Sequence, residues 1–140
     1  MKIAILGCGG LGRAAAKMIE QKEEISLVAV CDKDGFLVNE QGIDPKTIYN
    51  LQPQQTIADI GQSSEDTIGE IIKASQNIDG ILITLPNLPN EFIPGVAQRF
   101  LDGGYEGAFS DPLKRTQAMQ IMFTKDDLFK QSKSTYLSGT

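Results

Sequence analysis

The stretch near the N-terminus that decides the fold reads Ile3-Ala4-Ile5-Leu6-Gly7-Cys8-Gly9-Gly10-Leu11-Gly12. An apolar run is followed at once by the spacing G-x-G-x-x-G and then by residues with helical periodicity. Strand, glycine turn and helix in this order predict a cradle for a pyrophosphate, because glycines allow a tight turn and close approach of the backbone. The helix start adds free N–H groups and a positive dipole end. We therefore expect a dinucleotide-binding site at Gly7, Gly9, Gly10, Leu11 and Gly12.

An acidic residue follows at the position that such a site requires. Asp32 lies 20 residues beyond Gly12 and follows a second apolar run, Ile25 to Cys31. A carboxylate there can accept hydrogen bonds from the adenosine ribose. The same side chain could instead form a turn within Asp32 to Gly35. Lys33 leaves the choice between NAD and NADP open, because its charge would offset the repulsion between Asp32 and a 2′-phosphate.

The composition is that of an ordinary soluble globular protein. The chain has 140 residues, 41% hydrophobic and 22% charged, which is enough for one domain with a real core. A net charge of −5 without a basic run argues against nucleic acid or a membrane surface as partner. No apolar stretch approaches the ~20 residues of a membrane span, and no leader precedes the first strand. We expect a cytoplasmic protein, and a homo-oligomer is compatible with the sequence.

Two residue types limit the chemistry. The chain contains no histidine, which excludes histidine-based acid–base catalysis and histidine-ligated metals, and we expect no metal site. Cys8 and Cys31 follow or end adjacent predicted strands. We interpret them as small buried packing residues rather than as a disulfide or a reactive pair.

The remaining pattern alternates between strands and helices. A short helix is expected after Asp44-Pro45, and Gly103-Gly104 should end a longer one. Further predicted strands cover Thr56 to Ala58, Ile81 to Leu85, Gly107 to Ser110 and Ser134 to Leu137. Ser63 or Ser64 and, later, Thr124 are the expected helix caps. This order predicts an α/β fold, an open, mostly parallel doubly wound sheet of the Rossmann type. We expect residues 1–140 to be a dinucleotide-binding domain from which a C-terminal substrate domain is absent.

Further candidate site residues follow the later strands, since ligands of doubly wound sheets lie beyond the carboxyl ends of the strands. Pro86 and Asn87 would lie beside the nicotinamide ribose or the substrate, or simply form a rigid loop. Arg13 could face the pyrophosphate or solvent. Lys114 could act as a nucleophile if desolvation and Arg115 lower its pKa, whereas Asp111 would raise it; the alternative is an ordinary surface lysine.

Five segments, spread over nearly the whole chain, carry a resemblance to a known family. They are Gly7-Cys8-Gly9-Gly10-Leu11-Gly12, Cys31-Asp32-Lys33-Asp34-Gly35-Phe36-Leu37, Leu85-Pro86-Asn87-Leu88-Pro89-Asn90, Asp111-Pro112-Leu113-Lys114-Arg115-Thr116 and Tyr136-Leu137-Ser138-Gly139. In these segments the chain resembles the cyanobacterial saccharopine-dehydrogenase-like oxidoreductases. The first segment is generic, whereas the third and fourth are much more specific.

Within that group the resemblance is to the (S)-8-amino-7-oxononanoate synthases of biotin biosynthesis, which are suicide enzymes. It implies that a lysine amine condenses with the substrate's ketone and that NAD(P)H reduces the imine. Carboxylation of the substrate's 8-amino group, oxidation by NAD(P)+ on the lysine side and hydrolysis then leave the nitrogen on the product and an aldehyde on the lysine. Lys114 matches that lysine, so the resemblance implies NAD(P)H as cofactor, a small-molecule substrate and Lys114 as the catalytic residue.

Three other interpretations remain. The segment from Val28 to Ile43 also resembles the cofactor domain of homoserine dehydrogenases. A saccharopine-type reductase, a close relative, is the second alternative. A module that senses a dinucleotide without catalysis belongs to a different class. The enzyme interpretations expect a gene product that continues beyond Thr140, in which case this fragment alone would be inactive, and the sensor interpretation expects a natural end there.

Overall fold

A computed structural model describes residues 1–89, 91–113 and 115–139. Strands and helices alternate along most of the chain, as the sequence pattern predicts. In order, the elements are β1 (Lys2–Leu6), α1 (Gly10–Ile19), β2 (Ser26–Cys31), β3 (Gly35–Val38), α2 (Pro45–Tyr49), the 3-10 helix η1 (Ile57–Asp59), β4 (Gln62–Ser63), α3 (Thr67–Lys73), the 3-10 helix η2 (Ser75–Asn77), β5 (Gly80–Ile83), α4 (Phe92–Asp102), β6 (Ala108–Asp111), α5 (Thr116–Thr124), α6 (Asp126–Ser132) and β7 (Thr135–Ser138).

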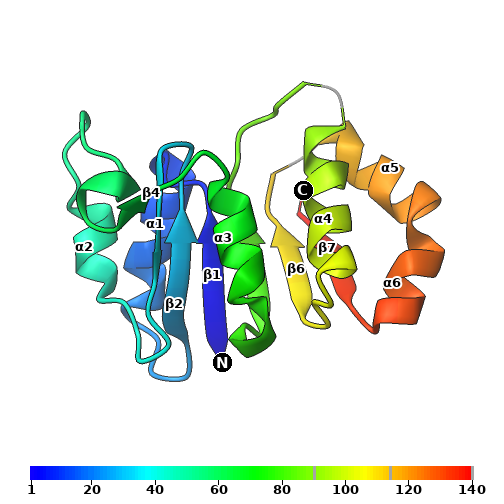
Figure 1. Ribbon diagram of the computed structural model, residues 1–140, viewed down its shortest axis with the longest axis horizontal. Coiled ribbons are helices and arrows are strands. Elements are labelled where there is room, and N and C mark those ends of the chain that lie inside the picture. The colour runs from blue at the N-terminus through cyan, green and yellow to red at the C-terminus, as the bar shows by residue number, and fades with distance from the viewer. Residues whose placement is uncertain (90, 114, 140) are drawn as a thin grey trace.

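The strands of the described residues form one sheet in the order β4-β3-β2-β1-β5-β6-β7. The five strands from β2 to β7 in this order are parallel to one another. β3 pairs antiparallel with β2 on one side and with β4 on the other. Figure 1 shows α3 and α4 in front of the sheet and α1 behind it. Because β1 is central and the chain winds outward from it in both directions, the expected doubly wound α/β fold is confirmed.

Two apolar layers, one on each face of the sheet, form the core. Successive residues of a strand point to opposite faces, and β1 follows this rule. Its Ala4 and Leu6 belong to the cluster with α3 and α4, and Ile5 belongs to the cluster with α1 and α2. In the larger cluster, Phe100 and Phe109 pack edge to face, with ring centroids 5.8 Å apart. A sheet covered on both faces explains why its central strands are continuously apolar.

The start of α1 lies in direct contact with the end of β1. Gly7 has φ +102°, a conformation that glycine adopts readily, and the chain reverses there. A Cβ on Gly12 would lie 1.9 Å from the carbonyl oxygen of Gly7, so a larger residue cannot fit without a backbone shift. The hydroxyl of Thr84, which follows β5, lies 2.6 Å from the same oxygen. The first and last glycines of the motif therefore fix the approach of helix to strand.

The third strand is the main correction to the sequence prediction. Thr56 to Ala58 does not form a strand: Ile57 begins the 3-10 helix η1. The position beside β2 is taken by β3, which returns antiparallel after a tight turn. The Asp32 carboxylate accounts for both differences, because it folds that turn and also accepts a hydrogen bond from the N–H of Ile57, at 2.7 Å.

Two expected helix caps were also wrong. Asp66, rather than Ser63 or Ser64, caps α3 by accepting a hydrogen bond from the N–H of Gly69. Thr124 ends α5 instead of capping α6. The short helix after Asp44 and the strands near residues 81–85, 107–110 and 134–137 are confirmed, with bounds shifted by one or two residues.

The Gly12→Ala variant tests the contact between helix and strand. We expect unfolding free energy to fall by about 2–3 kcal/mol, because the added methyl collides with backbone rather than with a flexible side chain. Gly95→Ala, on α4, is the matched control, since its Cβ would meet nothing within 4 Å. It should leave stability equal or slightly higher. Urea denaturation of both variants measures the difference, and equal stabilities would contradict the packing described here.

Candidate dinucleotide site

A cleft of about 720 Å³ lies at the carboxyl ends of the parallel strands. Its lining comes from the segments that follow β1, β2, β5 and β6, together with residues of α3 and α4. In Figure 1 the connection from β5 to α4 arches over this end of the sheet. The cleft therefore lies where doubly wound sheets bind their ligands.

The cleft brings together most of the residues singled out from the sequence. The predicted residues that line it are Gly7, Gly9, Gly10, Leu11, Asp32 and Pro86. Gly12 is buried behind the cleft in the contact between α1 and β1. Asn87 is exposed and does not line the cleft. Lys114 lies outside the described residues, although Leu113, its neighbour in sequence, lines the cleft.

The glycines of the motif divide into two kinds. Gly7 and Gly12 are required by the fold, as their backbone contacts show. Gly9 and Gly10, in contrast, would place a Cβ in open space, with nothing within 4 Å. Gly9 precedes α1 with extended backbone, and its carbonyl accepts the first helical hydrogen bond from Arg13, at 3.0 Å. The amides of the first helical turn have no partner within the helix, which leaves them for an anion.

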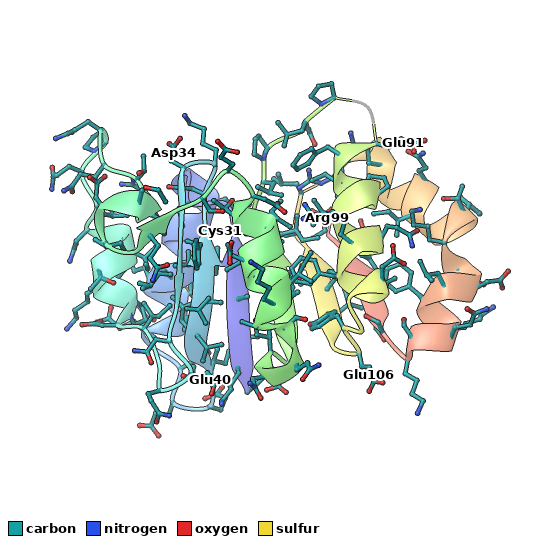
Figure 2. All side chains as sticks on the ribbon, viewed as in Figure 1. Cys31, Asp34, Glu40, Glu91, Arg99 and Glu106 are labelled. Carbon is teal, nitrogen blue, oxygen red and sulfur yellow. The ribbon has the colours of Figure 1, made fainter. Side chains whose placement is uncertain are left out.

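The carboxylate of Asp32 organises the turn after β2. Its Oδ1 accepts hydrogen bonds from the N–H groups of Asp34 and Gly35, both at 2.9 Å, and its Oδ2 accepts one from Ile57. Asp34 is at the top of this turn in Figure 2. The turn-forming alternative for Asp32 is therefore realised. Because each carboxylate oxygen can accept two hydrogen bonds, Oδ2 retains an acceptor position beside the cleft.

Two buried thiols lie at the floor of the cleft. Cys8 is 8% exposed and Cys31 is 1% exposed, and both are free. Burial is the largest cause that raises the pKa of each thiol to about 12, and the nearby Asp32 charge adds to the shift. Since the thiolate is the reactive form, these cysteines are unreactive packing residues near neutral pH, as expected from the sequence.

Arg13 does not line the cleft and is half-buried, with its guanidinium bound to backbone carbonyls. Its Nε donates a hydrogen bond to the carbonyl of Cys8, at 3.1 Å, and its guanidinium also donates to the carbonyl of Leu51. Arg13 thus ties the glycine turn to the segment after α2. Among the described residues, the cations that line the cleft are Lys33 and Arg99 of α4. Arg99 is paired with Asp66 at 2.6 Å, and Figure 2 shows it beside α3.

Sequence reasoning missed a buried ion pair behind the cleft. Arg115 Nε lies 2.8 Å from an oxygen of Asp111, and the two side chains are 1% and 0% exposed. Tyr136 of β7 donates a hydrogen bond to the same carboxylate, at 2.6 Å. Burial and this hydrogen bond raise the pKa of Tyr136 well above its usual range. Arg115 was considered for its effect on Lys114, but its charge is offset by Asp111.

Neither a metal centre nor a membrane span is visible in the described part of the chain. No group of three or more Asp, Glu, Cys or His side chains there could hold a metal ion. Among the same residues, no helix has the length and apolar character needed to cross a bilayer.

The expected resemblance to the (S)-8-amino-7-oxononanoate synthases is confirmed by a curated relative. The chain is 29% identical over 169 aligned positions to (S)-8-amino-7-oxononanoate synthase BioU of Haloferax mediterranei. The alignment covers 99% of this chain and 48% of that protein. The chain therefore spans about half the length of the curated relative that it matches.

Solved structures of similar fold are NAD- and NADP-dependent proteins. GenD2 from gentamicin A biosynthesis, solved in complex with NAD, is 17% identical with a TM-score of 0.56, over 99% of this chain and 34% of that one. Biliverdin reductase from Synechocystis, in complex with biliverdin and NADP+, is 16% identical with a TM-score of 0.57, over 98% and 37%. At these identities the likeness concerns the fold.

The match to a family model covers the part of the chain that builds most of the cleft. It extends over residues 1–85, from β1 and the glycine turn through the Asp32 turn to the end of β5. The model describes the glutamate/leucine/phenylalanine/valine dehydrogenases. The chain thus belongs to the Glutamate/Leucine/Phenylalanine/Valine dehydrogenase family.

Proposed function

We propose that residues 1–140 act as the NAD(P)-binding domain of an oxidoreductase and that the dinucleotide lies in the cleft over β1. The observation that carries this proposal is the open space at Gly9 and Gly10. The fold requires glycine at positions 7 and 12, whereas no atom of the described residues lies within 4 Å of a Cβ built at positions 9 and 10. A pyrophosphate there would contact backbone amides at the positive end of α1.

The rest of the cleft fits the two ends of such a cofactor. On the β2 side, Oδ2 of Asp32 can accept a hydrogen bond from the adenosine ribose. On the β5 side, Leu85, Pro86 and Leu88 offer an apolar wall to the nicotinamide. Lys33 is exposed and pairs only loosely with Asp34, at 3.3 Å, so it is available to a 2′-phosphate. The similar folds include both an NAD and an NADP+ complex.

For the reaction, we propose that Lys114 donates its nitrogen to an amino-ketone. The proposal is supported by the likeness to (S)-8-amino-7-oxononanoate synthase BioU and by Leu113, which brings the chain to the cleft immediately before Lys114. A bound nicotinamide supplies a hydride and later takes one back. The amine of Lys114 would condense with the ketone and lose water, and the substrate carbon of that imine would be reduced.

The release of the lysine nitrogen on the product would need a second transfer of a hydride, in the opposite direction. After carboxylation of the substrate's amino group by carbon dioxide or bicarbonate, a hydride would leave the ε-carbon of Lys114, so that the double bond moves to the lysine side. Water then splits this imine into an amine on the product and an aldehyde on the lysine. The substrate carbon is reduced, the lysine carbon is oxidised, and the nicotinamide ends as it began.

We also propose that substrate specificity comes from protein outside residues 1–140. The curated relative is about twice as long as the part that this chain matches. The cleft described above is lined mainly by groups suited to the dinucleotide. A cofactor domain of this kind would form one wall of the active site, and a substrate domain would form the other.

The Gly9→Val variant tests the cofactor site. A side chain there points into open space, so stability should be unchanged, whereas the pyrophosphate should be excluded. We expect affinity for NADH and NADPH to fall by at least about tenfold, roughly 1.4 kcal/mol. Titration calorimetry measures the affinity, with Gly95→Ala as the folded control. Wild-type affinity in Gly9→Val would argue against the cradle.

Mass spectrometry of the peptide that contains Lys114 tests the amine donor. The complete gene product would be incubated with NAD(P)H, 8-amino-7-oxononanoate and bicarbonate. We expect Lys114 to lose about one mass unit as its aminomethyl group becomes an aldehyde, in proportion to the product formed. Lys114→Arg should form no product. Product released from protein whose Lys114 is unmodified would contradict the sacrificial role and favour an ordinary dehydrogenase.

A further inference from the structure

The loop after β5 is held in place by Arg115, from the connection between β6 and α5, and by Gln117, from the first turn of α5. Arg115 donates hydrogen bonds to the carbonyls of Leu85, at 3.0 Å, and Pro86, at 3.1 Å. Two positions further on, Gln117 donates one to the carbonyl of Leu88, at 2.7 Å. Pro86 and Pro89 supply no backbone N–H, so this loop has fewer donors of its own for its carbonyls. Its conformation therefore depends on donors from the segment that leads into α5.

The guanidinium of Arg115 is itself fixed from behind. Its Nε donates to the Asp111 carboxylate and lies 3.0 Å from Oδ1 and 2.8 Å from Oδ2. The Tyr136 hydroxyl donates a hydrogen bond to Oδ2 of the same carboxylate, at 2.6 Å. The side chains of Arg115, Asp111 and Tyr136 are all buried or partly buried, and Arg115 is 7% exposed. Arginine presents its donors in a planar fork, so one immobilised end sets the direction of the other. The chain of contacts runs from β7 through β6 to the loop after β5.

The sheet order places this loop at the nicotinamide end of the cleft. Along the cleft come the Asp32 turn after β2, the glycine turn after β1, the loop at Leu85 and Pro86 after β5, and Leu113 after β6. With the adenosine ribose at Asp32 and the pyrophosphate at the glycine turn, the second half of the cofactor has to extend toward β5 and β6.

We propose that Arg115 is a positioning residue for the nicotinamide half of the cofactor. Arg115 positions the nicotinamide by holding the carbonyls of Leu85 and Pro86, so that this loop forms a fixed wall of the cleft. The inference rests on the proposed function, because it requires the dinucleotide to occupy this cleft.

The Arg115→Lys variant tests the proposal by comparing two ligands. Lysine keeps a positive charge for Asp111, but an ammonium cannot reproduce the fork that reaches two carbonyls. We expect affinity for NADH and NADPH to fall by about tenfold. Affinity for ADP-ribose and its 2′-phosphate, which lack the nicotinamide, should stay within about twofold of wild type. Titration calorimetry on the complete gene product gives all four values.

Two further variants keep the test decisive. Tyr136→Phe removes the more distant hydrogen bond to Asp111 and should weaken dinucleotide binding in the same direction by a smaller factor, even if Arg115→Lys fails to fold. Tyr105→Phe removes a comparable hydrogen bond, to the carbonyl of Ala108 at 2.7 Å, at the other end of β6. Tyr105→Phe should change neither the affinity for the dinucleotides nor the affinity for ADP-ribose.

The outcomes separate this inference from the proposed function. If wild-type protein binds neither ADP-ribose nor the dinucleotides, the cofactor site is wrong and the inference fails with it. If wild-type protein binds both, a parallel loss of affinity for both ligands in Arg115→Lys and Tyr136→Phe would show a general structural effect. That result, or unchanged affinity for both, would overturn the role of Arg115 and leave the cofactor site standing.

Discussion

The close contact between the start of α1 and the end of β1 is the constraint on which the rest of the structure depends. Gly12 can approach the carbonyl of Gly7 only because it has no side chain, and Thr84 holds the same carbonyl from β5. This contact places the start of α1 at the carboxyl end of β1, which pairs in parallel with β2 on one side and with β5 on the other. It thereby places the unpaired amides of the helix and the open side of Gly9 over one cleft.

The sequence predicted well those features that depend on neighbours along the chain. The strand, glycine turn and helix at Ile3 to Gly12 lie within ten residues, and their order alone indicates the phosphate cradle. The antiparallel β3 and the helix η1 were missed, because both depend on where the Asp32 carboxylate finds its donors. One of these donors, the N–H of Ile57, is 25 residues away. Local propensity at Thr56 to Ala58 could not show that bond.

The buried pair of Arg115 and Asp111 was missed for a related reason. The spacing of four residues between Asp111 and Arg115 was visible in the sequence. The other partners of this pair are the loop carbonyls at 85 and 86 and the hydroxyl of Tyr136. These partners lie 21 to 30 residues from either member, so the sequence did not indicate them. Removing one partner of such a pair costs about 3–5 kcal/mol. A cofactor site described from the glycine motif alone therefore omits the contacts that shape its other end.

We propose above that backbone amides at the start of α1 bind the pyrophosphate of a nicotinamide dinucleotide. A crystal structure of the chain with NADP+ or NAD+ bound is the decisive experiment. We expect the two phosphates to lie against the amides of Gly9 to Leu11, with the adenosine ribose toward Asp32 and the nicotinamide toward Pro86. Phosphates bound at any other part of the sheet would contradict it.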